Sequence, residues 1–258
     1  MSYRRIISYL VFVVILWPNL GFASNPHEGE KTILCPGTME AVFVKPELYD
    51  PNDNKIKQIE WSDAYISNGG YRGNPIIGRC GQGPFFWVFE AKDPYDPAFL
   101  HEVPPQYLEQ WKNPPTLMFP DESEYLQALA QGLATTRKRE IFLRLHAWWL
   151  ANDSVRDAVI NPETPFKEGS AARRNLEILT TLLDNSQPDQ LLLKVEALRE
   201  LGSFQEATAL LEKKLPADYR SMQGKLKKWI KEKSVFVKKI NGSSYRNSIS
   251  FYFIWKND

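Results

Sequence analysis

Residues 188–216, PDQLLLKVEALRELGSFQEATALLEKKLP, decide the fold of the carboxy-terminal half of the chain. Leu191 and Val195 share one face of a predicted helix, and Gly202 interrupts the pattern. A second amphipathic pattern begins at Phe204. Two short helices joined at a glycine bury little apolar surface alone. This stretch therefore predicts a helical hairpin that needs other helices beside it.

The turn of this hairpin carries three residues at a characteristic spacing. Gly202 opens the turn, Phe204 follows two residues later, and Ala207 stands where the two helices would cross. This order resembles the turn region of a tetratricopeptide repeat (TPR) over about one repeat. The first-helix tryptophan of that family is missing, and Val195 stands where its first glycine would fall. TPR proteins generally bind other proteins, so the resemblance implies a binding surface without chemistry. An ordinary helical hairpin is the alternative.

The chain from Asp121 onward supplies the neighbouring helices. Asp121 is a candidate N-cap, and Glu124 completes the spacing of a capping box. Residues 137–152 form the most apolar predicted helix, and residues 171–183 form a further amphipathic one. With the hairpin these make five helices, which predict an α-solenoid fragment or an irregular bundle.

The amino terminus has the pattern of a signal peptide. Arg4 and Arg5 precede the apolar run 6–17, Pro18 breaks the run, and Ala23 is a small residue of the kind that a signal peptidase reads. We therefore expect cleavage near Ala23 and a periplasmic or secreted protein. An uncleaved amino-terminal anchor is the alternative.

Export favours pairing of the two cysteines, Cys35 and Cys80. A disulfide between them would close a loop of about 46 residues and stabilise the fold by roughly 4 kcal/mol. Two free thiols are the first alternative. A metal site completed by His27 or His101 is the second, although two sulfurs without nearby histidines are too few for tetrahedral zinc.

Each cysteine stands between two apolar runs that predict a strand, a turn and a strand, within 32–44 and 76–89. This design resembles a zinc ribbon (residues 32–92) that has lost half of its cysteines, because Thr38 and Gly83 stand where the partners of Cys35 and Cys80 would be. The region is also similar to uncharacterised bacterial proteins that place a paired-cysteine ribbon ahead of TPR-like helices.

We divide the mature chain into a β module (30–92), a proline-rich connector (93–120), a helical domain (121–216) and a basic tail (217–258). Residues 56–66 are ambiguous between helix and strand. The connector predicts one helical turn near Tyr107 and Trp111. We expect its apolar side chains to pack against the helices; they are Phe99, Leu100, Tyr107, Trp111, Leu117 and Phe119.

The carboxy end is basic, because residues 213–258 hold 12 Lys and Arg against 3 Asp and Glu. Residues 225–239 predict a helix with an apolar side ringed by lysines. Such a helix could contact an anionic membrane surface or an acidic partner. The candidate contacts are Lys225, Lys227, Lys228, Trp229, Ile230 and Lys231. A solvated lysine face is the alternative. Residues 248–255 alternate like a strand that would pair with the amino-terminal sheet, or else they form a poorly ordered tail.

No catalytic motif stands out in the sequence. His146 lies in the most apolar predicted helix, and we interpret it as a packed core residue. The acid pairs Glu60/Asp63 and Asp93/Asp96 are interpreted as solvated or turn-forming residues. The sequence thus predicts no catalytic residue, cofactor or metal site.

Together these observations predict an α+β protein. It has a small disulfide-closed antiparallel β module followed by a helical domain. The expected function is an exported, non-enzymatic module of the bacterial periplasm or surface that uses its TPR-like helical groove to bind a protein or peptide, with no nucleic-acid partner. A cell-envelope enzyme with unrecognised acidic residues is one alternative, and a peripheral membrane-associated protein acting through its basic tail is the other.

Overall fold

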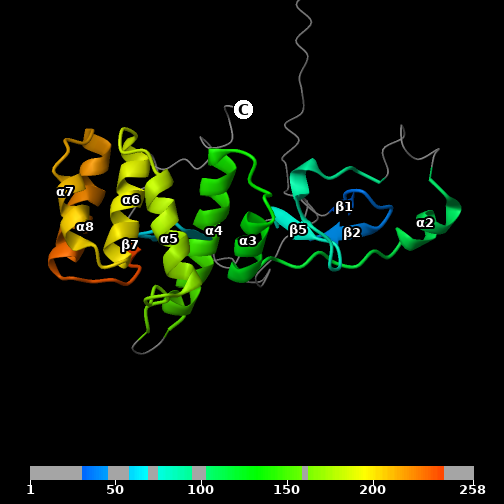
Figure 1. The fold of residues 1–258 in the computed structure, drawn as a ribbon, viewed down its shortest axis with the longest axis horizontal. Helices are drawn as coiled ribbons and strands as arrows, with labels where there is room; N and C mark the ends of the chain where they lie inside the picture. The colour runs from blue at the N-terminus through cyan, green and yellow to red at the C-terminus, as the bar shows by residue number, and fades with distance from the viewer. Residues whose placement is uncertain (1–30, 46–57, 69–74, 95–102, 159–161, 241–258) are drawn as a thin grey trace, which may run out of the picture.

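The computed structural model describes residues 31–45, 58–68, 75–94, 103–158 and 162–240. The protein is α+β, and its layers follow one another along the long axis (Figure 1). Helix α2 and two β-hairpins form one end, and helices α3 to α8 succeed one another toward the opposite end (Figure 1). The expected signal peptide lies outside the described residues.

The first hairpin pairs β1 (Lys31–Leu34) with β2 (Ala41–Val44) in antiparallel register. Its turn contains Gly37 at φ +74°, a conformation that suits glycine. A parallel bridge joins Phe43 of β2 to Thr116, so the extended chain after α2 borders this hairpin. Alternating side chains of the hairpin are buried on opposite faces, as in a strand pair covered on both sides.

The second hairpin pairs β5 (Ile77–Arg79) with β6 (Phe85–Trp87), and the short 3-10 turn η1 (Val88–Glu90) follows. One face packs on the first hairpin through Phe86, while the other packs on α3 and α4 through Ile77 and Trp87. The second hairpin therefore lies between the first hairpin and the helices.

The predicted disulfide between Cys35 and Cys80 is confirmed. It joins the two hairpins at the ends of β1 and β5, with the Cα atoms 6.1 Å apart. Such a bond is typical of proteins that fold in an oxidising compartment.

Helix α2 (Pro105–Gln110) confirms the helical turn expected in the connector. Its neighbour Trp111 is 1% exposed and packs against Leu34 and Ala41 of the first hairpin. The indole nitrogen of Trp111 also donates to the carbonyl of Met39 at 2.9 Å.

The apolar side chains of the connector were expected to pack on the helices. This was wrong for Trp111 and Leu117, which pack on the hairpins, because the first hairpin has two apolar faces that need covering. Phe99 and Leu100 lie outside the described residues.

All five predicted helices are present, and α8 extends the array. Their bounds are α3 (Glu122–Ala130), α4 (Arg137–Arg156), α5 (Ala171–Leu182), α6 (Pro188–Glu200), α7 (Phe204–Leu211) and α8 (Arg220–Lys231). The capping box at Asp121 and Glu124 is confirmed in both directions. The short 3-10 turn η2 (Ala217–Tyr219) precedes α8. Within the described ranges, no helix is long and apolar enough to cross a bilayer.

The hairpin of α6 and α7 turns at Gly202, which has φ +79°. The backbone N–H of Ser203 donates to the carbonyl of Leu198 at 2.8 Å, the bond that closes a helix end around a left-handed glycine. Ala207 is fully buried in the cluster that α6, α7 and α8 share. These are the roles that the sequence pattern assigned to Gly202 and Ala207.

A third sheet lies against the helices. Its strand order is β4-β3-β7, with β3 (Gln58–Trp61), β4 (Ile66–Asn68) and β7 (Lys239–Ile240). The ambiguous segment 56–66 thus contributes strands where it is described. The turn residue Ala64 has φ +63° and packs in the core cluster of α4, α5 and α6. Residues 58–68 therefore pack on helices, not on the other two hairpins.

The expected helix 225–239 is shorter at its carboxy end than predicted. Helix α8 ends at Lys231, and Lys233 takes a left-handed conformation at φ +51°. The chain then extends toward β7, because it can bond to the residue that follows β3. The backbone N–H of Ser62 donates to the carbonyl of Lys238, and the backbone N–H of Lys238 donates to the hydroxyl of Ser62, both at 2.8 Å. The strand expected at 248–255 lies outside the described residues.

The disulfide should be a structural bond that resists reduction in the native protein. A thiol can approach Cys80, but Cys35 is 2% exposed among apolar side chains and would have to leave as a thiolate there. We expect no free thiols in folded protein treated with dithiothreitol. Replacing both cysteines with serine should cost about 2–5 kcal/mol of unfolding free energy in urea titrations. Rapid native reduction with an unchanged urea midpoint would contradict this account.

Candidate functional site

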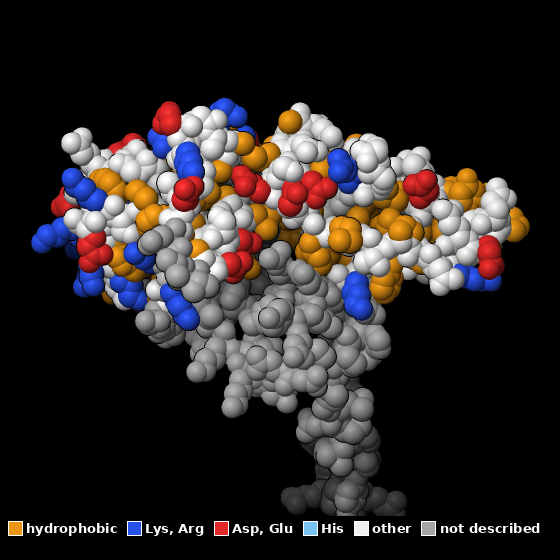
Figure 2. Space-filling view, turned by 90° about the horizontal axis from the view of Figure 1, so that it is seen from below, with side chains coloured by type: hydrophobic (Ala, Val, Ile, Leu, Met, Phe, Trp, Pro, Cys, Tyr) orange, Lys and Arg blue, Asp and Glu red, His pale blue; other side chains and the backbone are white. Residues whose placement is uncertain are grey.

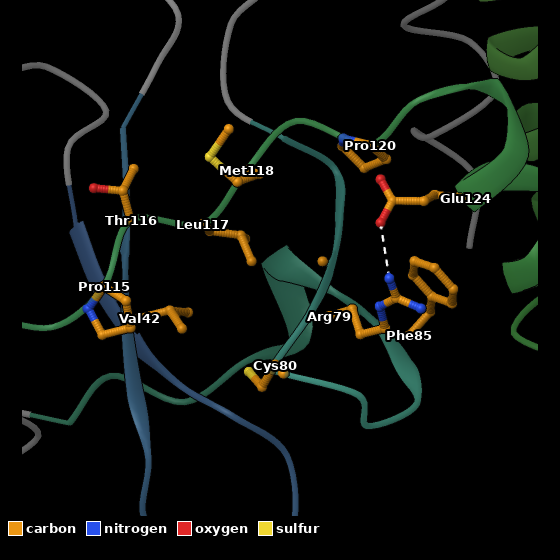
Figure 3. A pocket seen from close by; sticks show the side chains of 12 residues that line it. Val42, Arg79, Cys80, Phe85, Pro115, Thr116, Leu117, Met118, Pro120 and Glu124 are labelled. Carbon is orange, nitrogen blue, oxygen red and sulfur yellow. Dashed lines mark hydrogen bonds and ion pairs between the residues drawn. The ribbon is translucent and has the colours of Figure 1, made fainter.

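A surface pocket of about 220 Å³ lies beside the disulfide, between the two hairpins and the start of α3 (Figure 3). The second hairpin contributes one wall, and the extended segment before α3 contributes the opposite wall. The lining residues are Val42, Gly78, Arg79, Cys80, Gly81, Phe85, Pro115, Thr116, Leu117, Met118, Pro120 and Glu124.

The close approach of the two walls depends on a glycine. A Cβ atom at Gly78 would lie 2.7 and 2.9 Å from the two methyl carbons of Leu117 and 3.2 Å from the ring of Phe86. Leu117 is 5% exposed, so it has little room to move away. Leu117 can therefore pack this closely on β5 only because Gly78 has no Cβ atom.

One ion pair crosses the pocket. Arg79 bonds to Glu124 at 3.2 Å, and its guanidinium group lies over the ring of Phe85 at 4.9 Å (Figure 3). Gln127 accepts a further hydrogen bond from Arg79 at 3.4 Å. Arg79 is thus held by an acid, an amide and an aromatic face.

The first turn of α3 adds acidic groups beside this ion pair. The hydroxyl of Ser123 and the backbone N–H of Glu124 hold the pKa of Asp121 below its usual value. Partial burial raises the pKa of Glu122, and the charge of Asp121 adds to that shift. An incoming partner would therefore meet negative charge at this border.

Met118 is the most exposed large apolar side chain in the described part of the protein, at 78%. It lines the pocket, and its side chain is drawn above Leu117 in Figure 3. An exposed flexible thioether beside an apolar wall is a common feature of protein-binding surfaces.

A second group of polar side chains is buried where the β3–β4 turn meets α4 and α6, and we call it the buried cluster. The side chain of Arg156 is 4% exposed, and the other members are at most 2% exposed as whole residues. The members are Asp63, Asn152, Arg156, Glu196, Arg199 and Glu200. Glu60 and Asp63 were interpreted as solvated or turn-forming acids. Solvation was wrong for both, because they are 7% and 0% exposed, although Asp63 does lie in the β3–β4 turn. This turn is covered by helices that the local sequence does not include.

Sequence reasoning missed the other members of the buried cluster. A signal was present in α6, where Glu196, Arg199 and Glu200 follow an i, i+3, i+4 pattern on a helix whose other positions are largely leucine and valine. Charged residues at that spacing share one helix face. The pattern could have indicated a charged face, but not its burial.

His146 is a packed residue, as expected. Its ring lies 4.1 Å from that of Phe142, 4.8 Å from Trp149 and 5.3 Å from Tyr125. Burial lowers the pKa of His146 to about 4, so the ring is neutral above that pH. Its Nδ1 lies 3.0 Å from the carbonyl oxygen of Phe142.

The candidate membrane contacts on α8 divide into two groups. Ile230 is 7% exposed, and Trp229 is partly buried against the same cluster, so both apolar side chains face the protein. Lys227, Lys228 and Lys231 are exposed, whereas Lys225 is half-buried. Lysine and arginine side chains gather at this end of the molecule (Figure 2).

Within the described ranges, no three His, Cys, Asp or Glu residues are placed to hold a metal ion. His27 and His101 lie outside those ranges. Comparisons with protein-family models, with curated proteins and with solved structures give no match.

The role of Gly78 can be tested by adding a single carbon. Gly78→Ala should destabilise the protein by about 1–3 kcal/mol, because the new methyl group overlaps Leu117. The matched control is Gly224→Ala in α8, where a Cβ meets nothing within 4 Å. That change should stabilise the helix by up to about 1 kcal/mol. Urea denaturation measures both effects, and equal values for the two variants would contradict the pocket geometry.

Proposed function

We propose that this protein is an exported, non-enzymatic binding module that holds a partner protein at the pocket beside Cys80. The observation that carries the proposal is the exposure of Met118, at 78%, on the rim of a pocket that is lined by both apolar and polar groups. The helices serve in this proposal as the support that fixes the pocket.

The inner face of the helices is a poorer candidate for the partner. Asp63 contacts Asn152 and Arg156 of α4, and Arg199 of α6 donates to the carbonyl of Phe236 at 2.9 Å. The chain itself therefore occupies this part of the helical surface. A partner would have to displace a segment that is tied by buried ion pairs.

The pocket has the opposite properties. One wall belongs to the second hairpin, which the disulfide ties to the first. The opposite wall packs closely on it where Leu117 meets Gly78, so the pocket is fixed before binding. Preformed sites avoid much of the entropy cost of ordering on association. A volume of about 220 Å³ suits one anchoring side chain better than a whole cofactor.

The chemistry of the pocket border specifies the partner further. Asp121 and Glu122 add negative charge where Arg79 already has Glu124 as its acid. We infer that the partner presents an aliphatic or aromatic side chain with a lysine or arginine close by. Opposite charge at the rim would guide the approach more than it would raise affinity.

Met118→Asp tests this proposal directly. The variant should keep the stability of the parent protein, because the side chain is exposed, and should lose most partner recovery in pull-downs from envelope extract. The control is Ile178→Asp on α5, where an apolar side chain is 42% exposed away from the pocket. Purified partner should then bind the control at least about tenfold more tightly than Met118→Asp, a difference of about 1.4 kcal/mol. Equal binding to the two variants would overturn the proposed site.

The exposed lysines of α8 support a second candidate function, contact with an anionic membrane surface. Because Trp229 and Ile230 face the core, binding in this case would rest on charge and would fall steeply with salt. In flotation assays with vesicles of anionic phospholipid, the triple variant Lys227→Glu, Lys228→Glu, Lys231→Glu should no longer be recovered with the vesicles. Trp229→Phe should float like the parent. Recovery of the triple variant at the parent's level would remove this candidate.

A further inference from the structure

The buried cluster contains three carboxyl groups and two guanidinium groups. Arg199 forms a two-pronged pair with Glu196, at 2.7 and 2.6 Å. Arg156 forms an ion pair with Asp63. Arg156 also pairs with the partly exposed Asp153 at 2.8 Å. Both arginines are thus engaged by acids other than Glu200, and Glu200 is the buried acid left over.

The contact of Glu200 with a cation is weak. Its Oε1 lies 3.5 Å from Nη2 of Arg199, an ion-pair distance without a hydrogen bond. The same Nη2 already donates to Glu196 at 2.6 Å and to the carbonyl of Phe236 at 2.9 Å. Arg199 therefore has little left to offer a second carboxylate.

The two oxygens of Glu200 differ in their surroundings. Oε2 accepts hydrogen bonds from the indole of Trp148 at 2.7 Å and from the amide of Asn152 at 3.0 Å. Oε1 is buried and has no hydrogen-bond partner. A buried carboxylate oxygen without a donor is costly because it is charged, and burying the neutral carboxylic acid costs much less.

Burial also raises the pKa of Glu200 well above its usual value, and the charges of Glu196 and Asp63 add to the shift. Arg199 and the amide of Asn152 oppose it. The direction agrees with the geometry, because Oε1 of Glu200 has no hydrogen-bond donor and lies 3.5 Å from an arginine that already binds Glu196.

We propose that Glu200 is a neutral carboxylic acid in the folded protein at neutral pH, and that it acts as a pH-dependent clasp between the β4-β3-β7 sheet and the helices. With Glu200 neutral, the three acids and two arginines of the buried cluster balance in charge. Loss of the proton leaves one negative charge in excess inside the protein.

The excess charge acts on the attachment of the sheet. The Nδ2 atom of Asn152 lies 3.0 Å from both Glu200 and Asp63, so it holds the two acids close together. Asp63 is in the turn that joins β3 to β4. Repulsion between the two acids therefore weakens the contact that fixes this turn on α4.

The sign of the pH dependence follows from the raised pKa. In the unfolded chain, the pKa of a glutamic acid is about 4.3. The contribution of Glu200 to stability is fully present below that pH and is lost as the pH rises through the folded-state pKa. Between these two values, the folding equilibrium constant falls up to about tenfold for each pH unit.

Other ionisable groups lie near Glu200 and also bear on the pH dependence. Burial raises the pKa of Asp63 as well, while its partner Arg156 opposes that shift. Glu196 and Arg199 form the pair on α6. His146, on α4, has a pKa of about 4 in the folded protein against an ordinary value of 6.5, so its own contribution to stability rises with pH between these two values. This contribution is the same in the parent and in a variant of Glu200.

The experiment measures urea unfolding of the full chain at steps from about pH 5 to about pH 8. Glu200→Gln keeps the size of the side chain and an acceptor for Trp148 but cannot ionise. Relative to Glu200→Gln, the parent should lose stability as the pH rises, by up to about tenfold per pH unit in the equilibrium constant, because the other titrating groups act alike in the two proteins. The control Glu177→Gln changes an exposed acid on α5 and should follow the parent. The same slope in Glu200→Gln and in the parent would overturn the proposal.

A second measurement does not depend on the variant folding. The indole N–H of Trp148 donates to Glu200, so its NMR shift should titrate in the parent protein with a midpoint well above the usual pKa of glutamic acid. The amides of Ser62 and Lys238, which bond across the sheet, should lose protection from exchange at the same midpoint after correction for intrinsic rates. An indole signal that titrates near pH 4, or not at all up to the onset of alkaline unfolding, would rule out a neutral Glu200 as a clasp.

Discussion

The amide of Asn152 donates to Asp63 and to Glu200, and this contact fastens a strand turn from early in the chain to helices from its second half. Two further contacts hold other segments of the chain at the same place. The indole of Trp149 donates to the backbone of Asp63 at 2.9 Å, which holds the turn from a second side. Arg199 binds the carbonyl of Phe236 and so brings the chain after α8 to the same place. The β4-β3-β7 sheet can form only because both segments are held there.

This fastening has an energetic character different from that of the apolar layers. Leu176 and Leu179 of α5 are fully buried with Leu145 of α4, and such packing depends little on pH or salt. Buried charges contribute only while each has its partner, and an unpaired one is strongly destabilising. The helices thus form a stable support, while the sheet lies on them through contacts that are sensitive to protonation.

The opposite end of the molecule is closed by covalent and steric means. The disulfide ties the first hairpin to the second, and Gly78 lets Leu117 approach the second hairpin closely. The first hairpin is covered on both faces, by Phe86 on one side and Trp111 on the other. Rigid walls of this kind suit a preformed docking pocket, and they lie far along the molecule from the basic end formed by α8 (Figure 1).

Much of the local structure was predictable because it depends on neighbours in the sequence. The capping box at Asp121, the helix end at Gly202 and the apolar periodicity of α4 to α7 each need only a few consecutive residues. The pairing of Cys35 with Cys80 followed from two cysteines and an expected oxidising compartment. The end of α8 was misjudged, because the pairing of Ser62 with Lys238 lies outside the local pattern.

The sequence by itself determined the α+β class, the five central helices and the disulfide, since periodicity, capping residues and cysteine number are local properties. Only the tertiary structure decided that Glu60 and Asp63 are buried, that Trp111 covers a hairpin and that Met118 borders a pocket. Each of these depends on which distant segment lies opposite the side chain. Burial and charge pairing are properties of both partners, and a sequence read along one strand or helix contains only one of them.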